Sequence, residues 1–309
     1  MSAEWLRDLL FWLAEALGTD YLTLKPVLTI LLVCTLCGMV GSQVVGNRMA
    51  FFSDTMAHAA FAGVALGSLT AIILAVPRLI GPGEPNPRAE LLILLVMVLF
   101  GGAVGVAIVS TREGTGLSND TIIGVFFAAA IGFGAMLFPL VRRLGGYDPE
   151  GFLFGSPVFV VEEYLLNLAI VGVLTAGVVG WRYNQMMFAS FHTSLARTRR
   201  INLRLNNYLF IVLLALVVNL SIKAVGALLI NALLVVPAAT AASIAGNLRQ
   251  MFWLTIAYCV AAGLAGYAIS TAVDFGPSGT IVVVSVVLFF GSWGLARFLG
   301  RAPVRTGLR

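Results

Sequence analysis

Charge is scarce in this sequence. Only 11% of its 309 residues are charged, 60% are hydrophobic, and the mean hydropathy is +0.98. A soluble globular protein uses roughly 25% charged residues to cover its surface. The scarcity of charge therefore argues against a soluble domain. Because a helical span needs about 20 apolar residues, we expect an all-α, polytopic membrane protein with about eight or nine transmembrane helices.

Residues that carry enzymatic chemistry are also few. Neither of the two lysines, Lys25 and Lys223, lies in the G-x-x-x-x-G-K-S/T pattern that binds nucleotide phosphates. The two histidines, His58 and His192, are too few for a histidine-rich catalytic metal cluster. G-x-S-x-G and H-E-x-x-H do not occur. We therefore expect no enzyme and no permanently bound cofactor, and any energy must come from a partner or an ion gradient.

The three cysteines, Cys34, Cys37 and Cys259, all lie inside apolar runs, which argues against a disulfide framework. Cys34 and Cys37 form a C-x-x-C that would share one helix face. A redox or metal pair is one interpretation of this spacing. Two small packing residues in a membrane helix is the interpretation that we favour.

Apolar runs predict an ordered series of spans. Residues 4–17 predict an amphipathic helix at the membrane interface. Residues 1–25 thus form an N-terminal interfacial segment, 26–299 a transmembrane domain and 300–309 a cytoplasmic tail. The two short spans at 207–244, with Pro237 inside the second, form either two passes or a broken, re-entrant pair. The predicted spans are 26–45, 55–76, 90–110, 121–141, 158–180, 207–222, 225–244, 252–271 and 280–299.

The distribution of basic residues predicts the orientation. With the N-terminus outside, the cytoplasmic segments contain 12 of the 19 basic residues and 3 of the 14 acidic ones. The positive-inside rule then places the C-terminus in the cytoplasm of a cell-membrane protein, and explains the net charge of +5 without nucleic acid as a partner. Residues 182–206 carry five arginines and no acid, so they form either an anchor on anionic lipid or, as we favour, a docking surface for a cytoplasmic partner.

Small residues recur at helix-packing spacing. The pairs are Gly63 with Gly67, Gly101 with Gly105, and Gly263 with Gly266. They predict close contact between helix backbones but do not by themselves indicate transport.

The most informative cluster lies at the start of the second span. Asp54 and His58 are four residues apart and share a helix face. A carboxylate and an imidazole suit zinc, manganese or ferrous iron better than calcium or magnesium, and ionisable residues in a span are functional candidates. In the alternative interpretation, Ser53 and Asp54 only cap the helix. Two ligands are too few for a tight site, so others would come from another span or a symmetry mate. Asn231, in the run LLINALLVVP, either lines a path or bridges helices.

Two long segments, RMAFFSDTMAHAAFAGVALG and KAVGALLINALLVVPAATAA, resemble the zinc/manganese/iron-type ABC importer permeases. Weaker matches are SNDTIIGVFFAAAIGFGAML, FLFG and DFGPSG, in the family's order. The sequence departs from the family where Ser53 replaces a glycine and where His192 replaces an aspartate. The resemblance implies a fold like that of the cobalamin- and siderophore-type importer permeases.

The resemblance also implies a function, that of a homodimeric permease. It implies two kinds of partner as well: two cytoplasmic ABC ATPase subunits and an extracytoplasmic metal-binding receptor. The family's metal-path residues correspond to Asp54 and His58, and we add Asn231 to this set. Coupling to the ATPase is expected in the cytoplasmic loop, at His192, Leu195, Ala196, Arg197 and Arg200. The alternative, a gradient-driven secondary metal transporter, would typically show internal repeats and several charges at mid-membrane, and the sequence has no clear repeat.

Overall fold

The computed structural model describes residues 4–47, 49–74, 87–143, 160, 162–191 and 202–298. These residues form ten helices and no strand. The helices are α1 (Glu4–Leu17), α2 (Tyr21–Gly46), α3 (Ala50–Ile73), α4 (Pro87–Thr115), α5 (Asn119–Arg143), α7 (Glu162–Phe191), α9 (Leu203–Val225), α10 (Ala227–Ile244), α11 (Leu248–Val273) and α12 (Pro277–Phe298).

Nine helices of the described chain, α2 to α12, are long and apolar enough to cross a membrane. The all-α, polytopic prediction is thus confirmed, and each predicted span corresponds to one helix. The ends differ by several residues, since most helices continue beyond their apolar runs while α3 ends three residues before the predicted end and α7 starts four residues after the predicted start. The loop predicted at 182–206 was wrong in part, since α7 extends to Phe191 and α9 starts at Leu203. The span predicted at 90–110 began too late, because α4 starts at Pro87, and proline is tolerated in a first helical turn.

Local sequence explains several helix ends. Asn202 and Asn247 accept hydrogen bonds from the Leu205 and Gln250 amides and so cap α9 and α11. Gly226, at φ 85°, separates α9 from α10, because a side chain is strained in that conformation. Residues 207–244 thus lie in two separate helices, each long and apolar enough to cross a membrane. Pro237 lies inside α10 without ending it.

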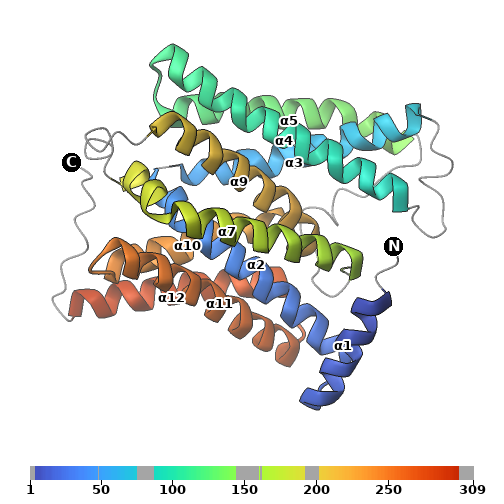
Figure 1. The fold of residues 1–309 in the computed structure, drawn as a ribbon, viewed down its shortest axis with the longest axis vertical. Helices are drawn as coiled ribbons and strands as arrows, with labels where there is room; N and C mark the ends of the chain where they lie inside the picture. The colour runs from blue at the N-terminus through green and yellow to red at the C-terminus, as the bar shows by residue number, and fades with distance from the viewer. Residues whose placement is uncertain are drawn as a thin grey trace.

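The helices pack as a layered bundle (Figure 1). On one side α3 packs against α4 and α5, and on the other α11 packs against α2 and α12. Helices α7, α9 and α10 lie between these groups, and α10 contacts α2, α3 and α12. Helix α1 lies at the edge of the bundle beside α2, against which it buries Leu10 and Ala14, while Trp12 is 64% exposed. Its location at a membrane interface stays a prediction.

All three glycine pairs lie at helix contacts, but the predicted close approach of backbones is confirmed only at Gly63, Gly67 and Gly266. Gly101, Gly105 and Gly263 instead face the side chains of Asn219, Ile211 and Cys34. A methyl group added to Gly63 or Gly67 would lie 2.9 Å from the Cα of Met97 or Ile93 on α4. One added to Gly266 would lie 2.6 Å from the Cα of Ile281 on α12. These positions therefore allow backbone-to-backbone approach that any larger residue would prevent.

Candidate functional site

The start of α3 positions the two residues singled out from the sequence. The helix follows α2 after a short connection, and its N-cap residue, Met49, makes no side-chain capping bond. The Ser53 hydroxyl is buried and donates to the Ala50 carbonyl at 2.9 Å, inside its own helix. Asp54 instead accepts a hydrogen bond from another helix. The capping interpretation of Ser53 and Asp54 is therefore wrong.

Three predicted residues meet at this point. Asn231, in the second turn of α10, donates from Nδ2 to Oδ1 of Asp54 at 2.6 Å. The Nε2 atom of His58 lies 3.9 Å from the same Oδ1, which is beyond hydrogen-bonding distance. The side chains of Asp54 and His58 are 38% and 31% exposed. The structure thus brings together residues 177 positions apart in the sequence, on a face from which the carboxylate and the imidazole can be reached.

The register of α3 against α4 gives the depth of this group. Gly63 faces Met97 and Gly67 faces Ile93, so the two helices run antiparallel. Counting five residues back from Gly63 and five forward from Met97 puts His58 level with residue 102, next to the middle of α4 (Pro87–Thr115). Asp54 lies one helical turn closer to the start of α3. The pair therefore lies part-way along the bundle rather than at its end, at a level where an unpaired charge is costly.

Each partner restricts the orientation of one side chain. The ring of Phe127 on α5 meets the His58 imidazole edge-on, with centroids 4.9 Å apart and an angle of 85°. The amide of Asn231 has its Oδ1 atom buried and without a hydrogen-bond partner. Its Nδ2 is the end that faces Asp54, as an ionised carboxylate requires, because a carboxylate only accepts hydrogen bonds. Asn231 therefore bridges two helices and also contacts the candidate ligand.

One chain supplies an incomplete metal site. Among the residues that the structure describes, no group of three or more His, Cys, Asp and Glu side chains could hold a metal ion. One carboxylate and one imidazole bind a divalent cation weakly. Weak binding suits passage, because an ion that binds too tightly is not released.

The coupling residues lie outside the described part of the chain. This applies to His192, Leu195, Ala196, Arg197 and Arg200. The helices on either side of them are described. Arg182 of α7 donates to Oδ1 of Asn206 on α9 at 3.4 Å, and Arg204 of α9 lies 3.7 Å from Glu113 of α4. The C-terminal parts of α4 and α7 and the start of α9 therefore meet at one end of the bundle.

The cysteines form no disulfide. Cys34, Cys37 and Cys259 are free and buried. The Cys259 thiol lies 3.6 Å from the Leu233 carbonyl, and Gly263 provides the space opposite Cys34. The packing interpretation accounts for all three.

Sequence reasoning missed Phe127 and Asn219. Asn219 is fully buried in α9, donates to the Ala215 carbonyl of its own helix at 2.7 Å and packs against Gly101 of α4. Its signal was the same as that of Asn231, a lone amide in an apolar run. Phe127 gave no signal, because it is one of 20 phenylalanines.

Comparisons with known proteins agree with this architecture. A family described as the ABC 3 transport family matches residues 19–295. The chain is 27% identical over 263 residues to the high-affinity zinc uptake system membrane protein ZnuB of Haemophilus influenzae, covering 85% of this chain and 93% of that protein. It is 27% identical over 281 residues to the manganese import system permease protein ScaB of Streptococcus gordonii, covering 90% of this chain and 93% of that protein.

A solved structure shares the fold. The chain superposes on a chain of PsaBC from Streptococcus pneumoniae, determined in complex with Fab, with a TM-score of 0.73. The two are 23% identical, and the match covers 92% of this chain and 98% of that one.

Proposed function

The chain belongs to the ABC 3 transport family, and from this premise we propose that it is the membrane-spanning permease of an ATP-driven importer of divalent transition-metal cations. It is a multi-pass permease of the metal ABC transporter type and not itself an enzyme. The proposed cargo is zinc, manganese or ferrous iron. The observation that carries the proposal is the contact of Asp54, His58 and Asn231 inside the bundle.

The chemistry of this group supports a passing cation. The Asp54 carboxylate supplies a charge opposite to that of the ion, and the imidazole of His58 supplies a nitrogen that transition metals prefer to that of a lysine or amide. His58 Nε2 and Asp54 Oδ1 are 3.9 Å apart, so the two side chains do not hydrogen-bond to each other. Both side chains are partly exposed. An arriving cation therefore gains both ligands without first breaking a short bond between them.

The missing ligands suggest a second copy of the chain. Two ligands from one chain leave a tetrahedral or octahedral ion incomplete. In a two-fold dimer, a pair that lies close to the symmetry axis faces its own copy. Two carboxylates would repel each other when the site is empty, and a divalent ion would neutralise them. We propose a homodimer in which each chain contributes Asp54 and His58 to one route.

The proposed orientation determines where the partners bind. With the N-terminus outside, the metal-binding receptor contacts the outer ends of the helices. Two cytoplasmic ABC ATPase subunits contact the arginine-rich segment between Phe191 and Asn202, which includes His192, Leu195, Ala196, Arg197 and Arg200. ATP binding on the ATPase would then switch access to the metal route, while this chain supplies geometry and transient ligands.

Metal uptake into vesicles tests the proposal. Proteoliposomes that contain the chain and its partner ATPase are given radioactive zinc or manganese. Because loss of an outer-shell partner alone costs about 10–100-fold, we expect Asp54→Asn and His58→Gln each to lower uptake by at least about tenfold. Ser53→Ala is the matched control, because its hydroxyl bonds only to its own helix, and uptake should be unchanged.

Two outcomes would contradict the proposal. Unchanged uptake in assembled Asp54→Asn and His58→Gln variants would exclude the pair from the route. Uptake that needs no ATP and stops when an ionophore removes the ion gradient would support a secondary transporter instead.

A further inference from the structure

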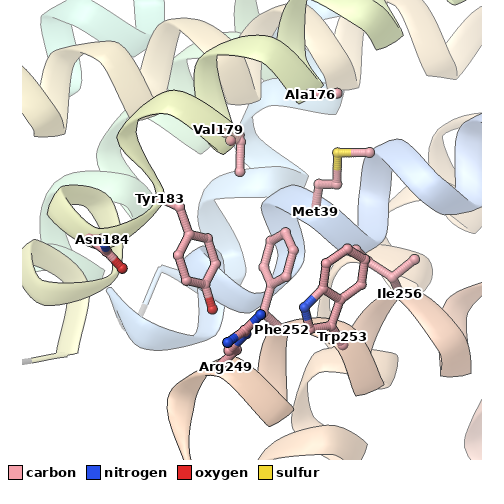
Figure 2. Close-up of a pocket in the computed structure, with 10 residues that line it drawn as sticks. Met39, Ala176, Val179, Tyr183, Asn184, Arg249, Phe252, Trp253 and Ile256 are labelled. Atoms are coloured by element: carbon pink, nitrogen blue, oxygen red, sulfur yellow. The ribbon is translucent and has the colours of Figure 1, made fainter.

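A groove between α7 and α11 lies apart from the candidate metal route (Figure 2). Its volume is about 530 Å³. A second hollow of about 550 Å³ adjoins it at the start of α11 and shares Arg249 and Trp253. The lining of the groove includes Met39 of α2, Tyr183 of α7, and Phe252 and Ile256 of α11. The proposed function assigns no role to these residues.

The groove has a cationic donor but no carboxylate to pair with it. Arg249 is exposed, and in the described part of the chain it has no ion pair or hydrogen bond. The Tyr183 hydroxyl is enclosed and has no hydrogen-bond partner. Figure 2 shows this hydroxyl and the Arg249 guanidinium pointing toward one another. The residues that line the two hollows include no aspartate or glutamate. The groove therefore complements a group that is anionic and accepts hydrogen bonds.

Polarity changes along the groove. Arg249 is the second residue of α11, and Tyr183 lies four residues before the end of the α7 span. Both are thus at the level where a span meets water. One or two turns deeper, the lining is apolar, with Val179 of α7 and Ile256 of α11. A charged end at the surface and an apolar continuation into the bilayer match the two parts of a phospholipid.

The aromatic rings fit the same level of the membrane. The Tyr183 and Phe252 rings meet edge-on with centroids 5.0 Å apart, and Phe252 meets Trp253 in the same way at 5.5 Å. Trp253 is 60% exposed although it is large and apolar. Tryptophan and tyrosine are enriched at membrane–water interfaces, where basic pockets between helices bind anionic head groups.

We propose that this groove binds one anionic phospholipid, with its phosphate on Arg249 and an acyl chain along Met39, Trp253 and Ile256. Since the Tyr183 hydroxyl is enclosed, it reaches the phosphate only as the Arg249 side chain turns outward. The lipid site lies apart from the metal route, so a negative lipid-binding result would not contradict the proposed function.

Quenching of Trp253 by brominated lipid tests the proposal. The purified full-length chain in detergent micelles is titrated with phosphatidylglycerol or phosphatidylcholine that carries brominated acyl chains. The emission of Trp253 is the difference between wild type and Trp253→Phe. We expect half-maximal quenching at an about tenfold lower fraction of phosphatidylglycerol than of phosphatidylcholine, the effect of one charge-assisted contact. Arg249→Gln should abolish this preference, and Arg249→Lys should retain most of it.

Arg297→Gln is the matched control, because Arg297 also lies against a tryptophan, 5.9 Å from the Trp293 ring centroid, near the end of α12. Its lipid preference at Trp253 should equal that of wild type. Equal quenching by the two lipids, or a preference that survives Arg249→Gln, would overturn the proposal. Displacement of the lipid by millimolar inorganic phosphate would assign the site to soluble phosphate instead. Absence of quenching by either lipid would mean that another surface, such as a second copy, covers the groove.

Discussion

At the scale of single residues, Asn231 restricts the orientation of Asp54. Its Nδ2 donates to Asp54 Oδ1 at 2.6 Å and joins α10 to α3 at the candidate ligand. A neutral amide does this without adding a charge that would compete with the cation. A lysine at the same position would form an ion pair with Asp54 and occupy the site permanently. The amide thus orients the carboxylate without pairing its charge.

Replacing Asn231 therefore tests a positioning role. Asn231→Leu removes the hydrogen bond at similar volume, and we expect roughly tenfold lower zinc or manganese uptake in proteoliposomes. Thr240→Val is the control on the same helix, because its hydroxyl bonds to the Val236 carbonyl within α10. Equal uptake by Asn231→Leu and Thr240→Val would show that the Asp54 contact is only structural.

At the scale of elements, polar side chains join helix α2 to helix α7. Glu162 at the start of α7 accepts from Lys25 Nζ at 2.9 Å and from the Tyr21 hydroxyl at 2.5 Å, both on α2. Burial alone would raise the pKa of Glu162, but the hydrogen bonds from Lys25 and Tyr21 outweigh it and lower the pKa from 4.5 to about 2. The ionised carboxylate therefore stabilises the contact between α2 and α7.

The sign of the shift predicts a pH dependence. Because the folded pKa is lowered, this stabilisation is fully present above about pH 4.5 and is lost as the pH falls toward about 2. Glu162→Gln should lower the free energy of unfolding by about 1–3 kcal/mol at pH 7. It should also flatten the fall in thermal midpoint between those two pH values, measured in detergent. Glu113→Gln is the control. Its partner Arg204 is 81% exposed, so the expected change is within about 1 kcal/mol. A Glu162→Gln midpoint that still falls like wild type would contradict this assignment.

At the scale of the whole molecule, orientation across the membrane decides which end meets the ATPase. The distribution of arginines predicts a cytoplasmic end formed by the C-terminal ends of α4 and α7 and the start of α9. The structure brings those ends together through Arg204 with Glu113 and Arg182 with Asn206. We therefore predict that this end faces the cytoplasm, and accessibility labelling measures it.

Two glycines offer a matched pair for that measurement. Gly114 at the end of α4 and Gly276 before α12 are both exposed, and an added Cβ at either would meet nothing within 4 Å. We expect an impermeant maleimide to label Gly276→Cys in intact cells, and to label Gly114→Cys only after permeabilisation. The native cysteines should give little background, because all three are buried. The reverse labelling pattern would mean that the N-terminus is cytoplasmic.

The sequence by itself determined the class of fold, the places of the apolar spans and the shared helix face of Asp54 and His58. These follow from local properties, since an apolar run of sufficient length predicts a span and a spacing of four places two side chains on one helix face. Only the tertiary structure decided that Asn231 contacts Asp54, that Phe127 lies against His58, and that the pair lies level with the middle of α4 rather than at a helix cap. These contacts depend on how helices far apart in sequence pack and in which register they meet. That register is set by many small contacts, such as those of Gly63 and Gly67, and a single sequence does not specify which surfaces those residues meet.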